Sequence, residues 1–440
     1  MNPSKNETLD GAKTPQKPYT LVDLFAGCGG LSLGLEHAGF QPVFVNEIHP
    51  DALQTYQDNR ENHYPYLKDK RFYSHDVKEL VMNKNRLNAL QEDLMHEFGI
   101  GTPGTGTSDL DLLVGGPPCQ GYSGIGHRRS YSVDKEQLPS NHLCQDMAYL
   151  INVFQPKIFL FENVRGLLNA RWTPAGTKGE IWADVEKTFT DIDGYDVRHS
   201  LILSKDYGIP QNRPRILLVG IRKDLSIKIN DDNPNFTAGG LLPHPSDSML
   251  PPPNLDDLLG DLIDPEYKNG EATNKYPHDA MTPIQRELRG NPDGGLFEKG
   301  DPLTDHEYSK HSPHVREKFR HMIKNGGRIP PRFRTKKFSQ KVLMPRWGEK
   351  GPNITVTSLA DDYVHWAQPR SLTVREWARM QTFPDWYQFR GKRTTGGIRR
   401  AGNPRESIHS RELPKYTQIG NAVPVQLARI LGQHFSTILR

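Results

Sequence analysis

Cysteine is scarce in this chain, and its placement excludes two common ways of stabilising a fold. Among 440 residues there are three cysteines, Cys28, Cys119 and Cys144, and no two of them form a CxxC pair. An odd number of widely spaced thiols argues against a disulfide framework and against a structural zinc site. We expect a protein of a reducing compartment that binds no metal.

Long apolar runs are scarce as well. None approaches the roughly 20 residues that span a bilayer, and the opening MNPSKNETLDGAKTPQKP is polar, without the apolar core of a signal peptide. These absences predict a soluble cytoplasmic protein with no membrane contact and a disordered tail over residues 1–18. The net charge is only +4, so a strongly basic surface has to come from local clusters of charge.

What the chain does contain is an alternation of short apolar runs and helical stretches from Tyr19 to about Lys223. The strand candidates are YTLVDLFAG, QPVFVNEI, RFYSHDV, DLDLLVGG, KIFLFENV, YDVRHSLIL and PRILLVGIR. Strands interleaved with helices predict an α/β fold with a doubly wound, mostly parallel sheet. Such sheets bind ligands beyond the carboxyl ends of their strands.

The texture of the sequence changes after this alternation. A stretch rich in proline and glycine opens a region without sustained patterning, which we predict to be a smaller inserted domain over residues 225–368. Residues 19–224 and 369–440 would then form the main domain. Within the latter, RSLTVREWARMQTF predicts a helix that ends before Pro384, and QIGNAVPVQLARILGQHFSTIL predicts a turn and a closing helix.

The turn DLFAGCGGLSLG is a candidate ligand site. Gly27 and Gly30 lie where a strand turns into a helix, so a ligand can approach the backbone closely. Glu47 ends the next strand 20 residues after Gly27, where a carboxylate often holds a ribose hydroxyl. The spacing is not GxGxxG, and an isolated glycine pattern is about as often a plain turn. With Glu47, nucleoside binding is favoured.

The turn GGPPCQGYS is a candidate catalytic loop. Cys119 follows a strand directly, and the two prolines before it restrict the loop. A lone cysteine is usually a packing residue, as we expect for Cys28 and Cys144. Glu162, at the end of the next strand, is suited to proton transfer but also fits a helix start. The segment QNRPR supplies Gln211, Arg213 and Arg215, whose donors suit substrate oxygens or the glutamate, or a surface ion pair.

Six segments in order resemble the motif set of DNA (cytosine-5) methyltransferases. They are DLFAGCGGLSLG, GGPPCQGYS, ENVRGLL, QNRPR, LTVREWARMQTFPDWY and QIGNAVP. The resemblance covers Tyr19 to Lys223 and Arg370 to the end. It implies a Rossmann-like domain that takes a methyl group from S-adenosylmethionine and releases S-adenosylhomocysteine, and an insert that is the target-recognition domain.

The resemblance also implies a covalent mechanism on double-stranded DNA. The Cys119 thiolate would attack cytosine C6 while Glu162 protonates or hydrogen-bonds N3, and C5 would take the methyl group. The cytosine must leave the duplex to be reached, so base flipping follows. The catalytic set implied in this way comprises Cys119, Glu162, Asn163, Gln211, Arg213 and Arg215.

Other roles transfer by the same motifs. The implied cofactor contacts are Phe25, Gly27, Gly30, Glu47, Ile48, Asp76, Pro118, Leu143, Asn421 and Val423. The loop after Cys119 and the basic residues 316–350, with twelve Lys or Arg against two Glu, suit contact with phosphates. The DNA contacts expected there are Ser123, Arg128, Arg129, Arg332, Arg334, Lys336 and Lys337. Residues 388–415, with eight Lys or Arg against two Glu, suit a further phosphate-contacting arm or a solvated loop.

The leading interpretation is a sequence-specific DNA methyltransferase of a restriction or defence system, with a cognate endonuclease or other defence proteins encoded nearby. Three other interpretations stay open beside it. An RNA (tRNA) cytosine-C5 methyltransferase would share the fold, although the large basic insert favours a reader of duplexes. A catalytically silent DNA-binding relative would be expected to lose Cys119, Glu162 or Arg213, and all three are present. A nicotinamide dehydrogenase is disfavoured because GxGxxG is missing.

Overall fold

The computed structural model describes most of the chain. The described residues are 17–101, 108–118, 142–173, 175–225, 239–245, 250–334, 340–346, 363–394 and 412–440. The strands of the main sheet are β1 (Tyr19–Leu24), β2 (Phe40–Asn46), β3 (Tyr73–Ser74), β4 (Leu112–Gly115), β5 (Ile158–Val164), β6 (Tyr195–Leu203) and β7 (Pro214–Arg222). All seven arise from the predicted strand segments.

The sheet has the order β3-β2-β1-β4-β5-β7-β6. The first five strands in this order are parallel, whereas β7 pairs antiparallel with both β5 and β6. The predicted doubly wound, mostly parallel sheet is therefore confirmed. The antiparallel β7 has a consequence for the site, because its first residues lie beside the last residues of β5, with Arg215 paired to Val164.

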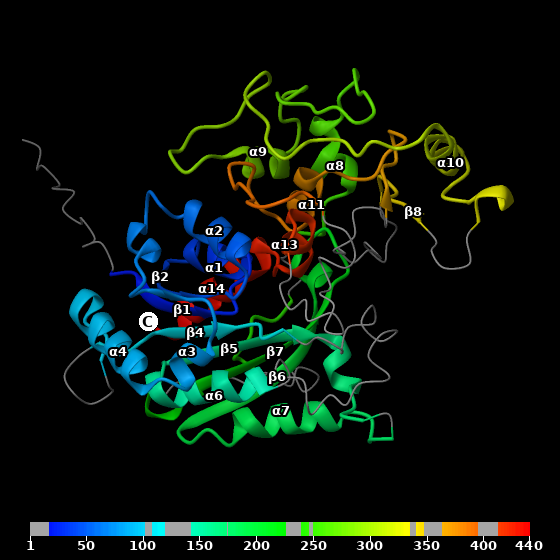
Figure 1. Ribbon diagram of the computed structural model, residues 1–440. Helices are drawn as coiled ribbons and strands as arrows, with labels where there is room; N and C mark the ends of the chain where they lie inside the picture. Colours follow the sequence, from blue (N-terminus) through cyan, green and yellow to red (C-terminus); the bar gives the residue numbers. More distant parts are fainter. Residues whose placement is uncertain are drawn as a thin grey trace, which may run out of the picture.

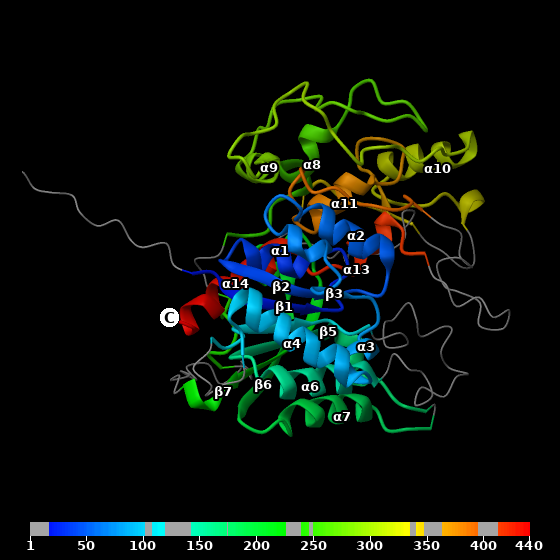
Figure 2. The ribbon, with the colours of Figure 1, turned by 60° about the vertical axis from the view of Figure 1, so that its left-hand side comes forward.

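Helices cover both faces of this sheet (Figures 1 and 2). One face carries α3 (Lys78–Val81), α4 (Lys84–Phe98), α6 (Leu143–Phe154) and α7 (Glu180–Thr190), and the other carries α1 (Gly30–Glu36) and α14 (Val425–Ile438). On α6 the buried residues recur at three- and four-residue spacing, for example Met147, Leu150, Ile151 and Phe154. The helix α2 (Pro50–Asp58) follows β2.

A second lobe lies above α1 and α2 in Figure 1. It contains α8 (Leu255–Leu259), α9 (Pro283–Arg289), α10 (Pro313–Lys324), β8 (Lys341–Val342), β9 (Tyr363–Val364), α11 (Val374–Met380) and α13 (Lys415–Asn421). Its core combines the leucines of α8 with Trp377 and Met380 of α11 and with Ile419 of α13. Residues on both sides of the predicted boundary at 368 thus share one core, and the sequence pattern did not indicate this.

Two local features explain the elements near the C-terminus. Thr373 and Glu376 form a capping box that starts α11, and Thr382, at φ 57, follows the end of that helix. The segment that we expected to be a turn before the closing helix is itself helical, since α13 extends to Asn421 before Pro424 precedes α14. In the described part of the chain, no helix is long and apolar enough to cross a membrane.

Candidate active site

The carboxyl ends of β1 and β2 form the first half of the site. After β1 the backbone takes the left-handed conformation at Phe25 (φ 57) and at Gly27 (φ 58). For a bulky residue such as Phe25 this is a strained conformation. Hydrogen bonds maintain it: Ala26 N donates to Asn46 O at 2.9 Å, and Phe25 N donates to Asn46 Oδ1 at 3.4 Å. The turn is held in one shape before any ligand binds.

Glu47 is bound to this turn through backbone groups. Its Oε2 accepts from Gly27 N at 2.8 Å, and its Oε1 accepts from His49 N at 2.7 Å. Burial raises the pKa of Glu47, while His49 and the two N–H donors act in the opposite direction. Each carboxylate oxygen has a second lone pair, so the group can also accept from ligand hydroxyls. Gly27 and Glu47, both predicted from the sequence to contact one ligand, are thus hydrogen-bonded to each other.

Asn46 organises three strand ends, and the sequence analysis did not single it out. Besides the contacts with Phe25 and Ala26, its Nδ2 donates to Ser74 Oγ at 3.0 Å and to His75 O at 3.0 Å. The side chain is buried. The available signal was its place directly before Glu47, at the end of an apolar strand.

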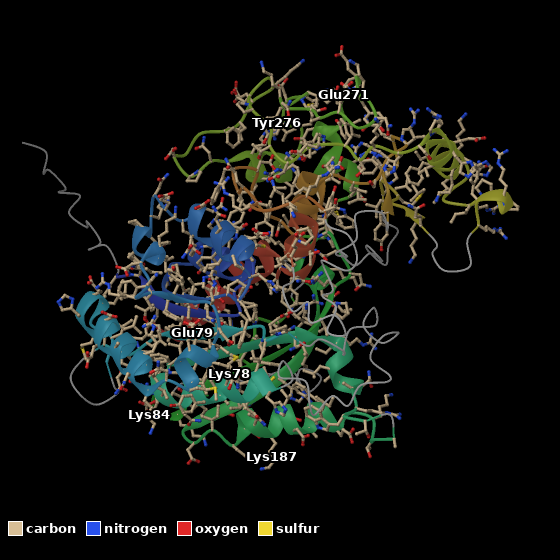
Figure 3. The ribbon with its side chains drawn as sticks, viewed as in Figure 1. Lys78, Glu79, Lys84, Lys187, Glu271 and Tyr276 are labelled. Carbon is tan, nitrogen blue, oxygen red and sulfur yellow. The ribbon has the colours of Figure 1, made fainter. Side chains whose placement is uncertain are left out.

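The residues after β3 and at the start of α6 extend the same edge. Asp76 is exposed, and its Oδ1 accepts from Lys78 N at 2.9 Å. Lys78 Nζ reaches Asp146 Oδ1 of α6 at 2.7 Å, which ties the Asp76 turn to the helix that begins with Leu143. Figure 3 labels Lys78 beside this helix. Ile48 presents an apolar side chain that is 57% exposed beside Glu47.

The second half of the site lies at the ends of β4 and β5. Arg215 Nε lies 2.5 Å from Glu162 Oε1, and the two groups form an ion pair. Their geometry does not meet the requirements of a hydrogen bond. A Cβ added at Gly116 would lie 3.0 Å from Glu162 Oε2, so the turn after β4 passes directly over the carboxylate. The predicted neighbourhood of the two strand ends is confirmed.

Asn163 fixes the same turn from below. Its Nδ2 donates to Pro117 O at 3.2 Å, and its Oδ1 accepts from Val164 N at 2.7 Å. The side chain is buried, and it thereby ties the end of β5 to the turn at Pro117. The described chain reaches Pro118, which is exposed, whereas Cys119 lies outside the described residues.

The two described cysteines behave as predicted. Cys28 is buried with its Sγ 3.5 Å from Gln418 O, and Cys144 packs against the sheet core. Burial raises the pKa of each thiol to about 12. A nucleophilic cysteine reacts as the thiolate, and neither of these two forms an appreciable amount of thiolate at neutral pH. Both are packing residues.

The QNRPR segment connects the site to the second lobe. Arg213 Nη2 donates to Gly420 O at 2.6 Å, and Gln211 Nε2 donates to Met380 O at 2.7 Å and to Gln381 Oε1 at 2.8 Å. Gln211 is fully buried by these contacts. They make it a residue that positions the segment, and its proposed place in the catalytic set remains a prediction.

Arg213 and Gln381 complete this junction. Burial lowers the pKa of Arg213, Arg215 adds to the effect, and Glu162 opposes it. Gln381 Nε2 donates to Ile419 O at 2.7 Å and to Ala422 O at 3.0 Å. Gln381 therefore links QNRPR to QIGNAVP, and the sequence analysis did not identify this role.

The predicted cofactor residues near the C-terminus fall into two kinds. Asn421 is exposed at the end of α13. Val423 is buried, and its carbonyl oxygen would lie 2.5 Å from a Cβ at Gly30. Gly30 thus allows the close packing of the first turn against the C-terminal segment. Contact of Gly30 or Val423 with a cofactor remains a prediction.

The predicted DNA contacts lie mostly outside the described part. Arg332 and Arg334 are exposed in the second lobe, where Arg332 pairs with Glu317. Outside the described residues lie Ser123, Arg128, Arg129, Lys336 and Lys337, as do four of the eight basic residues of 388–415. Across the described ranges no group of three or more His, Cys, Asp or Glu is arranged to hold a metal ion.

The fold and this site together define an α/β protein with a glycine turn held by a buried carboxylate at one half of a sheet edge and a carboxylate–arginine pair at the other. The model of the C-5 cytosine-specific DNA methylase family matches residues 19–437. The chain belongs to this family. It is a DNA cytosine-5 methyltransferase, and its family takes the methyl group from S-adenosylmethionine.

Individual relatives agree with this assignment. The chain is 28% identical to the type II methyltransferase M.DdeI of Desulfomicrobium norvegicum, over 94% of this chain and 88% of the relative. It is also 28% identical to the type II methyltransferase M1.HphI of Haemophilus parahaemolyticus, over 94% and 86%. A crystal structure assigned as a DNA modification methyltransferase of an E. coli prophage shares the fold, with a TM-score of 0.63 at 22% identity, over 96% of this chain and 99% of that chain.

Proposed function

We propose that this enzyme methylates C5 of a flipped-out cytosine in one specific double-stranded DNA sequence, through a covalent bond between Cys119 and C6. The observation that carries the proposal is the junction of β4 and β5. There the turn that leads into Cys119 passes over Glu162, and Arg215 holds one oxygen of that carboxyl. Cys119 follows Pro118 directly in the sequence, and we propose that it attacks a base held at Glu162.

The residues of the first half fit S-adenosylmethionine. A Cβ placed on Gly27 would meet no atom of the described residues within 4 Å, which leaves room for a ligand beside this backbone. Glu47 supplies acceptors suited to ribose hydroxyls, and Ile48 an exposed apolar side chain suited to an adenine ring. Asp76 would accept from the adenine amino group. When bound, the cofactor supplies an electrophilic methyl group.

The protein groups would then divide the reaction into easier steps. Cys119 as thiolate adds to C6, and Glu162 gives a proton to N3, which makes C5 nucleophilic. Arg215 keeps the Glu162 carboxyl oriented, and Arg213 steadies the cytosine from the same segment. After methyl transfer, a base removes the C5 proton, the thiolate leaves C6, and the proton on N3 returns to Glu162.

The second lobe is proposed to recognise the target sequence, with Arg332 and Arg334 contacting phosphates. The matched relatives are named type II methyltransferases. We infer on that ground that this enzyme protects host DNA from a cognate endonuclease. We also propose that it acts in the cytoplasm, where it binds the host's DNA.

The first test is base-resolution cytosine-methylation sequencing of DNA from a methylation-free host that expresses the chain, beside its Cys119→Ala variant. We expect one short motif to be methylated by the wild type only. Unmethylated DNA from well-expressed wild-type protein would contradict the proposal, and methyl transfer to tRNA in the same extracts would identify the RNA alternative.

A second test addresses the nucleophile itself. Duplex DNA with 5-fluorocytosine at the target blocks loss of the C5 substituent, so the wild type should form a denaturation-resistant adduct that contains the DNA. The Cys119→Ala variant should form none. An adduct with that variant would show that another residue attacks C6.

A further inference from the structure

A buried polar network joins the glycine turn after β1 to the second lobe, and Arg60 is at its centre. Arg60 lies just beyond α2 and is 1% exposed. Its guanidinium donates to Gly29 O at 3.1 Å, to Tyr56 O at 3.0 Å and to the Tyr387 hydroxyl at 3.0 Å. That hydroxyl donates to Cys28 O at 2.5 Å. Two consecutive carbonyls of the turn are thus held by side chains from outside it.

Gly29 is the residue that permits this approach. Its φ is +83, and a Cβ there would lie 2.7 Å from the Tyr56 ring, 2.8 Å from Arg60 Nη1 and 3.0 Å from the Tyr387 hydroxyl oxygen. Gly27 differs, because no atom from the described part of the chain lies within 4 Å of its Cβ position. The two glycines therefore serve different neighbours: the protein network packs against Gly29, and the space beside Gly27 is open to a ligand.

The charge and the hydrogen-bond donors of Arg60 also have partners in this network. Arg60 Nε donates to Glu36 Oε1 at 2.7 Å, and the Arg60 guanidinium lies 3.8 Å from the centre of the Tyr56 ring. A buried ion pair is favourable only when its remaining donors find partners. Here the carbonyls of the turn and the Tyr387 hydroxyl provide those partners, which gives the turn a rigid support.

The second lobe contributes Tyr387 from a segment that is anchored to the main domain. Next to it, Gln388 N donates to Asn59 Oδ1 at 2.8 Å, and Asn59 Nδ2 donates to Gln388 O at 2.7 Å. Tyr387 itself is fully buried. The end of α2 and the segment after α11 therefore behave as one unit behind the turn.

We propose that Arg60 and Tyr387 are positioning residues for the methyl donor. They hold the carbonyls of Cys28 and Gly29 so that the hydrogen bond from Gly27 N to Glu47 Oε2 is kept. The inference rests on the proposed cofactor site at Gly27 and Glu47. Gly27 is bonded to Cys28, so a shift of the Cys28 carbonyl alters the hydrogen bond between Gly27 and Glu47. A residue of the second lobe thereby sets the affinity of the main domain for its cofactor.

The test is equilibrium binding of S-adenosylhomocysteine to the full chain, measured by titration calorimetry for the wild type and for Tyr387→Phe. This variant removes only the hydroxyl that links Arg60 to Cys28. We expect its Kd to rise about three- to tenfold, the range that corresponds to one buried hydrogen bond. Steady-state kinetics should show the same rise in KM for S-adenosylmethionine with kcat nearly unchanged.

Tyr276→Phe is the matched control. Tyr276 is also buried in the second lobe, and its hydroxyl donates to Asp385 Oδ2 at 2.7 Å (Figure 3). The control should lose thermal stability as Tyr387→Phe does, yet bind S-adenosylhomocysteine like the wild type. Equal weakening in both variants, or no weakening in Tyr387→Phe, would overturn the inference.

Arg60→Lys gives a second, independent variant. It keeps the charge opposite Glu36 but loses the planar fork that reaches Gly29 O and the Tyr387 hydroxyl together. We expect weaker binding than in Tyr387→Phe, and wild-type affinity would overturn the inference. Wild-type protein that binds no S-adenosylhomocysteine would overturn the proposed cofactor site and this inference together, whereas unchanged affinity in both variants would overturn the inference alone.

Discussion

Glu162 is held unequally at its two oxygens, and this asymmetry suits an acid that gives up its proton in one direction. Arg215 Nε lies 2.5 Å from Oε1, while Oε2 faces the turn at Gly116. Since Arg215 and Asn163 occupy the strand ends on either side, neither the carboxyl nor the turn can rotate far. The geometry leaves Oε2 facing the turn at Gly116.

At this scale we predict that Glu162→Gln abolishes most of the methyl transfer. The amide has nearly the same shape but cannot supply a proton, and such proton transfers contribute about 100- to 10,000-fold to rates. Single-turnover transfer to DNA should fall by a factor in that range, with S-adenosylhomocysteine affinity unchanged. Glu92→Gln, at an exposed position of α4, is the control. A rate within twofold of the wild type would exclude Glu162 as the acid.

At the scale of elements, strand direction decides which side chains share the site. Had β7 run parallel to β5, its first residues would lie at the opposite edge of the sheet. Because it runs antiparallel, Arg215 is paired with Val164, one position beyond Asn163. The contact of α1 with α14 matters in a similar way, since it joins the glycine turn after β1 to the C-terminal segment (Figure 2).

The α1–α14 contact leads to a stability prediction for Gly34→Ala. In an isolated helix this change stabilises by about 1 kcal/mol. Here the new Cβ would lie 2.2 Å from Val425 O and 2.4 Å from Ala428 Cβ. Overpacking of this kind lowers the free energy of unfolding by about 1–3 kcal/mol. Chemical denaturation should show this loss, with Glu92→Ala within about 0.5 kcal/mol of the wild type as the control. A gain in stability would mean that the two helices separate easily.

At the scale of the whole molecule, the second lobe is built around charged and polar groups. Arg289, Arg370, Arg375 and Arg379 are all fully buried. They pair with carboxylates, some nearby in the sequence and some from distant segments; for example, Arg379 contacts both Asp385 and the distant Asp261 at 2.5–2.6 Å. Such pairs specify a geometry, because a buried charge that loses its partner costs several kcal/mol.

Two neutral histidines within this lobe make its stability depend on pH. Burial, aided by Arg370, lowers the pKa of His365 to about 3, with Glu376 opposing. Burial likewise lowers the pKa of His306 to about 4. His365 Nδ1 accepts from Ala367 N at 3.0 Å, which requires that nitrogen to carry no proton. As pH falls below about 6.5, the unfolded chain takes up protons that the folded chain refuses, so stability is lost.

We therefore predict that His365→Asn reduces the acid sensitivity of folding. Between pH 7 and pH 5 the wild type should lose about 2 kcal/mol more of its free energy of unfolding than the variant does. Urea denaturation at both pH values measures this difference. Burial raises the pKa of Asp23 to about 7. Its contribution has the opposite sign, since the stabilisation is lost as the pH rises from the pKa of the unfolded chain through 7. It is present in both proteins and cancels. If the free energies of unfolding of the wild type and of His365→Asn changed with pH in parallel, His365 would have a folded-state pKa near its ordinary value.

Local patterns in the sequence were sufficient for a large part of this protein. The strands, the two glycine turns and the positions of Glu47, Glu162 and Arg215 could be predicted, because apolar periodicity and ligand-binding turns depend on neighbours along the chain. The packing roles of Cys28 and Cys144 were predicted as well. The motif order identified the family before any contact was known.

Only the tertiary structure decided which of these residues meet. It showed that Gly29 faces Arg60 and Tyr387, that Gln211 supports the QNRPR segment through Met380 and Gln381, and that residues on both sides of position 368 share one core. It also revealed Asn46 and Gln381 as links between segments. The physical reason is that these contacts join residues tens to hundreds of positions apart, and no local pattern encodes the direction of a strand or the partner of a buried side chain.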